Sequence, residues 1–185
     1  SAQRWIEHHL SLVFARFEAP LYAAAFSAWS REDGAEIARL NADFIATRES
    51  AEPRAETVQV GFSYAAWCRE VAPLSDAQRT TLGAMERISG PVGAALAAVA
   101  SGVTVRDGLL GYTFGFTENQ VMVLAKALPM GQIAAQKLLF ALGGAVSAAV
   151  DVALVLPEDD WSSASPWLAI AQMKHETQYS RLFRS

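Results

Sequence analysis

Four side chains of this sequence could bind a transition metal through nitrogen or sulfur: those of His8, His9, Cys68 and His175. A protein metal site needs several such ligands converging on one ion. Neighbouring residues of an α-helix project about 100° apart, so His8 and His9 are poorly placed to share an ion. We interpret them as a surface pair, with a weak or intersubunit metal contact as the alternative. On this basis we assign no metal ligand.

Catalytic chemistry has no recognisable set of residues in the sequence. The chain contains no Gly-x-Ser-x-Gly elbow, P-loop, His-Glu-x-x-His motif or dinucleotide-binding fingerprint. Cys68, between Trp67 and Arg69, is better interpreted as a packed thiol than as a nucleophile. The neighbouring acids Asp159 and Asp160 belong to a short loop that we expect to be solvated. We therefore predict a protein without catalytic residues, whose activity is binding.

Polar residues interrupt the apolar sequence in two places, and the first is the segment 111–120 with its continuation to Lys126. Tyr112, Asn119 and Lys126 are seven residues apart, so they share one stripe of an ideal helix. This stripe predicts either a partner-binding seam or the ordinary exposed face of an amphipathic helix. Lys126 also suits a helix C-terminus, where a cation interacts favourably with the helix dipole.

The second interruption is the end of the chain, residues 174–185. It carries three bases against one acid, a charge of +2 before the terminal carboxylate: Lys174, Arg181, Arg184 and Glu176. Its larger apolar side chains are costly to leave in water: Tyr179, Leu182 and Phe183. Chain ends often fray, but tyrosine and arginine are enriched at the energetic centres of interfaces. The tail therefore predicts docking, either onto a partner or onto the chain itself.

The elements that must position these residues are predicted to be helices. Alanine is abundant, and the alternating pattern of strands is nearly absent. We expect an all-α fold of about eight to ten helices in a single compact domain, residues 1–185. The expected helices cover residues 3–18, 20–29, 35–47, 76 to the Gly90-Pro91 break, 92–103, 106–127, 129–152 and 166 onward. Ser75 and Gln78 form a capping-box pattern, and Ser165-Pro166 is a helix start.

Composition and charge exclude several classes of protein. The chain has 185 residues, of which 52% are hydrophobic and 18% charged, so it can bury a core and is not intrinsically disordered. With 15 basic against 19 acidic residues, its net charge of -4 gives no general attraction for nucleic acid. The longest charge-free apolar run, residues 138–150, is shorter than the roughly 20 residues of a membrane span, and we interpret it as a buried helix.

Two observations indicate the compartment. Cys68 is the only cysteine, so no internal disulfide can form, which is typical of a reducing environment. The chain opens with Trp5, Ile6 and Leu10 at helical spacing rather than with a secretory leader. We expect a cytoplasmic protein.

The tail, Met173-Lys174-His175-Glu176-Thr177-Gln178-Tyr179-Ser180-Arg181-Leu182-Phe183-Arg184-Ser185, resembles the C-terminal signature of the UreF family of urease accessory proteins almost letter for letter. Three internal stretches are also similar to that family: residues 47–52, 111–119 and 126–136. Their order and spacing agree with the family as well. The family's usual opening segment, of the Leu-Pro-x-Gly kind, has no match here, so its contacts have no counterpart among these residues.

This resemblance implies an all-helical, non-catalytic chaperone that forms a homodimer. It implies that the protein bridges UreD, also called UreH, and the GTPase UreG in the complex that inserts nickel into apo-urease. Nickel and GTP would then be handled by the assembled complex. The implied UreD contacts are His175, Glu176, Tyr179, Ser180, Arg181, Leu182, Phe183 and Arg184. The implied surface for the GTPase or urease consists of Glu118, Asn119, Lys126, Gly131 and Gln132.

Two alternatives remain open within the same setting. The protein could regulate UreG as a GTPase-activating or gating factor through an inserted arginine, for which the candidates are Arg48, Arg54, Arg181 and Arg184. It could also bind nickel directly through His8, His9 or His175.

Overall fold

The computed structural model of the chain describes residues 2–163 and 165–178. Within these residues every regular element is helical, which confirms the all-α expectation. The elements are α1 (Ala2–Leu12), η1 (Phe14–Arg16), α2 (Glu18–Ser30), α3 (Gly34–Ala46), α4 (Ala51–Glu70), α5 (Asp76–Ala84), α6 (Gly90–Ala100), α7 (Val105–Ala127), α8 (Gln132–Ala141), α9 (Gly143–Ala153), η2 (Glu158–Asp160) and α10 (Pro166–Glu176).

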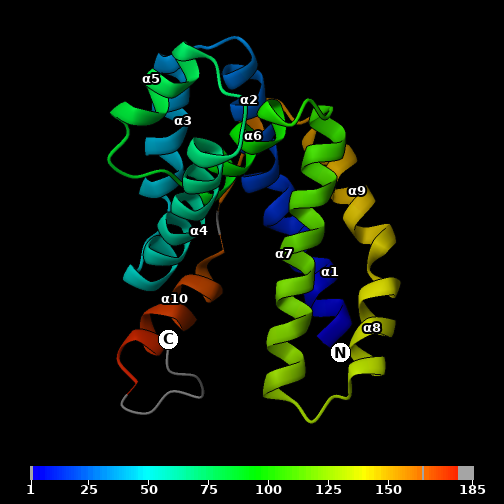
Figure 1. The fold of residues 1–185 in the computed structure, drawn as a ribbon. Coiled ribbons are helices and arrows are strands. Elements are labelled where there is room, and N and C mark those ends of the chain that lie inside the picture. Colours follow the sequence, from blue (N-terminus) through cyan, green and yellow to red (C-terminus); the bar gives the residue numbers. More distant parts are fainter. Residues whose placement is uncertain (1, 164, 179–185) are drawn as a thin grey trace.

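Helices α2 and α6 form the centre of the molecule. Helix α6 packs against both α2 and α4, while α3 and α5 lie on the α4 side and α1, α7, α8 and α9 gather on the other side (Figure 1). The first seven residues of α6, 90–96, are all buried. The indole Nε1 of Trp29, a fully buried side chain of α2, donates to the Val92 carbonyl at 3.1 Å.

The N-terminus of α6 is held by side chains from α3 and α4 rather than by its own N-cap. Asn41 accepts from the Ser89 N–H and donates to the Arg87 carbonyl, each at 2.8 Å. The Thr57 hydroxyl accepts from the Gly90 N–H at 2.9 Å. These bonds satisfy donors that a helix start leaves free, and they fix where α6 enters the core.

Small residues let α4 and α6 approach closely. A Cβ atom added to Gly61 of α4 would lie 2.0 Å from the Ile88 carbonyl oxygen, and one added to Gly93 would lie 3.1 Å from the Tyr64 Cβ. Because the first of these contacts is to backbone, no side-chain rotation can relieve it.

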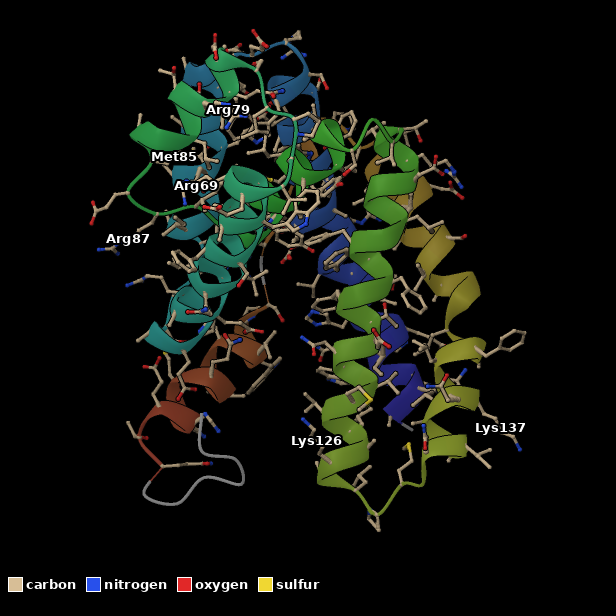
Figure 2. The ribbon with its side chains drawn as sticks, viewed as in Figure 1. Arg69, Arg79, Met85, Arg87, Lys126 and Lys137 are labelled. Carbon is tan, nitrogen blue, oxygen red and sulfur yellow. The ribbon has the colours of Figure 1, made fainter. Side chains whose placement is uncertain are left out.

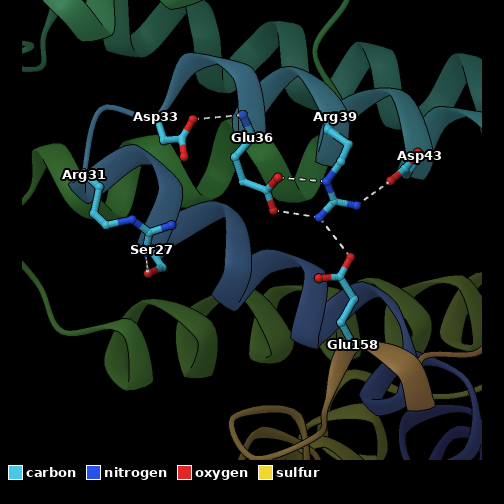
Figure 3. Close-up of polar contacts among 7 residues, drawn as sticks. All are labelled: Ser27, Arg31, Asp33, Glu36, Arg39, Asp43 and Glu158. Atoms are coloured by element: carbon cyan, nitrogen blue, oxygen red, sulfur yellow. Dashed lines mark hydrogen bonds and ion pairs between the residues drawn. The ribbon is translucent and has the colours of Figure 1, made fainter.

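The connection from α9 to α10 is anchored along its length. Glu158 of η2 reaches Arg39 of α3 at 2.9 Å, and Arg39 also pairs with Glu36 and Asp43 (Figure 3). The Ser162 N–H donates to the Arg16 carbonyl at 2.9 Å. These contacts direct the chain so that α10 packs against α4.

Several sequence predictions of helix bounds are confirmed. Ser75 and Gln78 make both halves of the capping box at the start of α5. Helix α7 begins one residue before its predicted start and ends at Ala127 as expected, and α10 begins at Pro166.

Others are wrong. The expected helix 3–18 is interrupted after Leu12, because the chain turns to bury Phe14 and Ala15. Gly90-Pro91 begins α6 instead of ending the previous helix, since proline is accommodated in a first turn. Helix α4 was not predicted at all; its Pro53 also lies in the first turn.

The expectation that residues 138–150 form a buried helix is also wrong in part. The segment divides between α8 and α9 at Leu142, and Phe140 is 90% exposed. Only one face of these helices packs on neighbours, and its buried residues are Ala135, Leu142, Val146, Ala149, Val150 and Ala153. An apolar run without periodicity does not reveal that its outer face is uncovered.

The close contact of α4 with α6 predicts the effect of one methyl group. Gly61→Ala should lower the free energy of unfolding by at least about 2 kcal/mol, because overpacking against backbone forces the helices apart. Gly111→Ala is the matched control: it lies within α7, has no atom within 4 Å of the added Cβ, and should stabilise by about 0.5–1 kcal/mol. Urea denaturation of both variants measures the difference, and equal stabilities would contradict the close approach.

Candidate functional site

A groove of about 850 Å³ separates α1 and α7 from α4 and α10. Most of its large side chains are aromatic: Trp5, Phe14, Phe17, Phe44, Tyr64, Tyr112 and Phe116. Its charged side chains are Glu18, Arg48, Glu49 and Glu56. One wall is the inner face of α10, including Ile170 and Met173.

Stacked rings run from the groove into the core. The His9 imidazole lies between Trp5 and Phe116, with ring centroids 5.5 Å from each. Phe116 in turn stacks on Phe14 at 4.6 Å. Burial, with a smaller effect of Arg48, lowers the pKa of His9 and favours its neutral form. His9 is thus a packed aromatic group, so the interpretation of His8 and His9 as a surface pair holds for the exposed His8 and is wrong for His9.

A charged cluster ties α2, α7 and the α3–α4 connection together beneath the groove. The Tyr112 hydroxyl donates to Glu18 Oε1 at 2.7 Å, and Arg48 Nη1 lies 3.9 Å from Glu18 Oε2. The Arg48 guanidinium also stacks over the Phe44 ring, 4.1 Å from its centroid. Burial raises the pKa of Glu18, and Arg48 and Tyr112 offset this only in part. We call Glu18, Arg48 and Tyr112 the charged cluster.

The predicted polar stripe of α7 is therefore divided. Tyr112 turns inward to Glu18, whereas Asn119 and Lys126 are exposed. Asn119 lines the groove on the side opposite α10. A seven-residue spacing places residues on one stripe, but only the packing of α7 shows which part of that stripe is covered.

The α7–α8 end brings most of the remaining candidates together. Lys126 lies in the last turn of α7, Gly131 is the N-cap of α8 and Gln132 is its first residue. The same end of α7 and start of α8 carry exposed apolar side chains: Met122, Val123, Leu128 and Ile133. We call residues 118–133 the hairpin tip. In Figure 2, Lys126 and Lys137 project to opposite sides of this pair of helices.

Glu118 is also exposed, about two turns before Lys126 on α7.

The tail candidates that the structure describes lie across the groove, on α10. His175 Nδ1 is 2.7 Å from Glu52 Oε2, and Glu176 Oε1 accepts from the Glu52 N–H at 3.0 Å. Two stretches of family-like sequence therefore meet, the tail and residues 47–52. The candidates Tyr179, Ser180, Arg181, Leu182, Phe183 and Arg184 lie outside the described residues.

The other reactive candidates are not gathered into a site. Over residues 2–163 and 165–178 there is no group of three or more His, Cys, Asp or Glu side chains that could hold a metal ion. Arg48 is engaged by Glu18 and Phe44, and Arg54 donates to the Arg48 carbonyl at 2.8 Å. Cys68 is buried in α4, and burial raises the pKa of its thiol to about 11, which confirms a packed thiol.

Residues 132–153, which comprise α8, Leu142 and α9, are together long and apolar enough to cross a membrane by length and composition. Its most apolar window has a mean hydropathy of 1.6 and is 28% buried. Core helices meet the same criterion, and α9 packs against α1 and α7.

Sequence reasoning missed Glu18 and Glu52 as parts of the site. Glu52 belonged to the family-like stretch 47–52, which was the available signal. Glu18 had none, because its partner Tyr112 lies 94 residues away.

Comparison with known proteins gives consistent results. The family model for UreF matches residues 1–143. The urease accessory protein UreF of Azoarcus sp. (strain BH72) is 46% identical over 186 residues, covering 100% of this chain and 80% of the relative. Those of Janthinobacterium sp. (strain Marseille) and Methylibium petroleiphilum (strain ATCC BAA-1232 / LMG 22953 / PM1) are each 42% identical, covering 100% of this chain and 81% and 78% of the relatives.

The charged cluster predicts a pH dependence of stability. Because burial raises the pKa of Glu18, the folded state binds more protons than the unfolded state above pH 4.5, and its stability falls as the pH rises through the folded pKa. Glu18→Gln removes the buried charge, so the variant should gain stability relative to the wild type as the pH rises above 4.5.

Glu36→Gln is the control of opposite sign. Its hydrogen bonds from Arg39 lower the pKa of Glu36, so this variant should lose stability relative to the wild type as the pH rises, by less than about 1 kcal/mol for so exposed a pair. Thermal melts across the pH range measure both. A Glu18→Gln difference that follows the Glu36→Gln trend would contradict the assignment.

Proposed function

Because the chain belongs to the UreF family of urease accessory proteins, we propose that it is a non-catalytic chaperone that bridges UreD and the GTPase UreG during nickel insertion into apo-urease. Family membership supports a role in urease maturation, and it agrees with the resemblance of the tail and the internal stretches. The bridging role, the homodimer and a cytoplasmic location are our proposals.

The observation that carries the bridging role is the presence of two exposed surfaces on opposite sides of the groove. One is the hairpin tip, where Lys126 lies among exposed apolar side chains. The other is α10, which has no buried residue. Apolar side chains beside a cation are typical of protein-binding surfaces rather than of free ones. Two separate surfaces allow two partners to be held at once.

Helix α10 supports the UreD contact in particular. Trp167 is 84% exposed, and Ile170 and Met173 follow it at helical spacing and are about half exposed. A helix with so little buried surface can rearrange on a partner at small cost in lost packing. We propose that α10 and the tail bind UreD, and that the hairpin tip meets UreG or urease.

The outer face of α8 supports the homodimer. Ile133 is 74% exposed and Phe140 is 90% exposed, and their seven-residue spacing places both on one stripe. Most homodimers have a two-fold axis, about which the same surface of each subunit meets its copy. The exposed stripe of α8 is a candidate for such a surface. Nickel and GTP are proposed to be handled by the assembled complex.

Deletion of residues 174–185 tests the tail. Because α10 buries no side chain, the truncated protein should keep helices α1 to α9 and its melting temperature to within about 4 °C, a change of roughly 1 kcal/mol. Its co-purification with UreD should be lost. Circular dichroism and affinity co-purification measure the two properties, and undiminished UreD binding would refute the proposal.

Lys126→Glu tests the hairpin tip. Reversing this charge should reduce co-elution with UreG and activation of apo-urease by about tenfold or more, whereas a lysine near a helix end contributes no more than about 1 kcal/mol to the fold. Arg79→Glu is the control, since Arg79 is an exposed cation of α5, away from the hairpin tip and from the outer face of α8 (Figure 2). Equal losses in the two variants would leave Lys126 with no specific role.

A further inference from the structure

A hollow of about 60 Å³ lies between α4 and the loop that joins α5 to α6, residues 85–89. Its floor is apolar and buried, and consists of Ala65, Leu82 and Ile88. Its rim is exposed or half-buried and includes Phe62, Arg69, Met85, Glu86 and Arg87. None of these residues belongs to the hairpin tip, to α10 or to the outer face of α8.

A large apolar side chain is left uncovered at this rim. Phe62 is 58% exposed and shares one face of α4 with Ala65 and Arg69, because these positions are three or four residues apart. Met85 lines the same hollow from the loop. An exposed aromatic ring beside a flexible methionine is typical of a protein-binding surface, where the ring supplies contact area and the methionine adapts to the partner.

The hollow is formed before anything binds to it, because the backbone of the loop is held from two sides. Asn41 of α3 donates to the Arg87 carbonyl and accepts from the Ser89 N–H, each at 2.8 Å. These two bonds flank Ile88, and Gly61 of α4 lies against the Ile88 carbonyl. A preformed site loses less conformational entropy when it binds a partner.

The rim is cationic, although the chain as a whole is acidic. Arg69 and Arg87 line the hollow against Glu86, a charge of +1, whereas the chain carries -4. Glu86 is 89% exposed and lies 3.8 Å from the Arg87 guanidinium, a geometry that gives a weak pair in water. Arg69 has no ion pair or hydrogen bond within residues 2–163 and 165–178. Both arginines lie on the same side of the molecule as Met85, away from Lys126 (Figure 2).

Size and charge together define the occupant that fits. A volume of about 60 Å³ has room for about four to six water-sized groups, which matches the side chain of leucine or isoleucine. A guanidinium at the rim can bind a carboxylate through two parallel hydrogen bonds. The complementary ligand is therefore an aliphatic side chain flanked by carboxylates.

We propose that this hollow binds an acidic segment of a partner protein, with a leucine or isoleucine on the apolar floor and Asp or Glu side chains on Arg69 and Arg87. The surface is separate from the hairpin tip and from α10, so it adds a third contact. Its chemistry follows from the contacts of this chain alone. Its use in urease maturation rests on the proposed function.

A short peptide tests this chemistry on the full chain. The probe is the acetylated and amidated peptide Glu-Asp-Leu-Asp-Glu, titrated while NMR shifts are recorded. We expect a Kd on the order of 1 mM, with shifts centred on the lining residues. Glu-Asp-Gly-Asp-Glu and Lys-Lys-Leu-Lys-Lys should each bind at least about threefold more weakly, since one lacks the apolar group and the other the carboxylates. No shift of the lining residues at about 10 mM probe, or equal binding of the three peptides, would overturn the proposal.

Variants of the rim locate the binding. Arg87→Gln removes one cation and keeps the floor, so the acidic peptide should bind about threefold more weakly. Phe62→Ala should weaken binding by a similar factor. Arg79→Gln is the matched control, because Arg79 is an exposed arginine of α5 that does not line the hollow. Wild-type affinity in both Arg87→Gln and Phe62→Ala would overturn the assignment.

Sedimentation of the chain alone distinguishes a partner from a second copy. A second copy in the hollow would be released by Arg87→Glu, and the sedimentation coefficient would fall. We expect the same coefficient for Arg87→Glu and the wild type. A lower coefficient for this variant, with Arg79→Glu unchanged, would overturn the assignment to a partner protein.

Urease maturation tests the use of the surface. Arg87→Glu should lower the activation of apo-urease about threefold or more, while its binding of UreD and UreG stays at the wild-type level. Full activation by this variant, or a parallel loss of UreD or UreG binding, overturns the third contact. Failure of the wild-type chain to support activation overturns the proposed function instead, and the peptide titration still decides whether the hollow binds acidic segments.

Discussion

The close approach of α4 to α6 at Gly61 is the constraint on which the rest of the structure depends. It brings Gly61 against the backbone of residues 88–89, and there Thr57 of α4 accepts from the Gly90 N–H while Asn41 of α3 accepts from the Ser89 N–H. These contacts fix where the small-residue helix α6 enters the core between α2 and α4. With α6 fixed there, the helices divide into two groups on either side of it (Figure 1). The groove lies between α4 and α10 of one group and α1 and α7 of the other.

The charged cluster joins these two groups at the polar part of the groove. Glu18 belongs to α2, Tyr112 to α7 and Arg48 to the connection that leads into α4. A largely buried carboxylate is tolerated because a hydroxyl and a guanidinium face it. The remaining walls are aromatic or belong to α10, and His175 and Glu176 of α10 contact Glu52 of α4. The molecule thus combines a firmly packed centre with the lightly packed helix α10, which can rearrange when a partner binds.

The surfaces proposed to bind partners follow from this division. The hairpin tip joins α7 to α8, and α7 and α9 pack on α1, while outer side chains of the tip such as Ile133 stay exposed among the described residues. Helix α10 reaches α4 only after a connection anchored by Arg39 and by the Arg16 carbonyl. The two surfaces therefore come from segments on opposite sides of the groove, and a single chain can present both.

The sequence by itself determined the features that depend on near neighbours. Alanine content and the lack of alternation predicted the all-α class, the Ser75–Gln78 spacing predicted the start of α5, and the tail and internal stretches predicted the family. Tertiary structure alone decided that Tyr112 turns inward, that Phe140 remains exposed and that Glu176 caps α4. Those outcomes depend on partners 94 or 124 residues away, or on whether another helix covers a face. The spacing of residues in the sequence determines on which face of its helix a side chain lies. It does not determine which other element packs against that face.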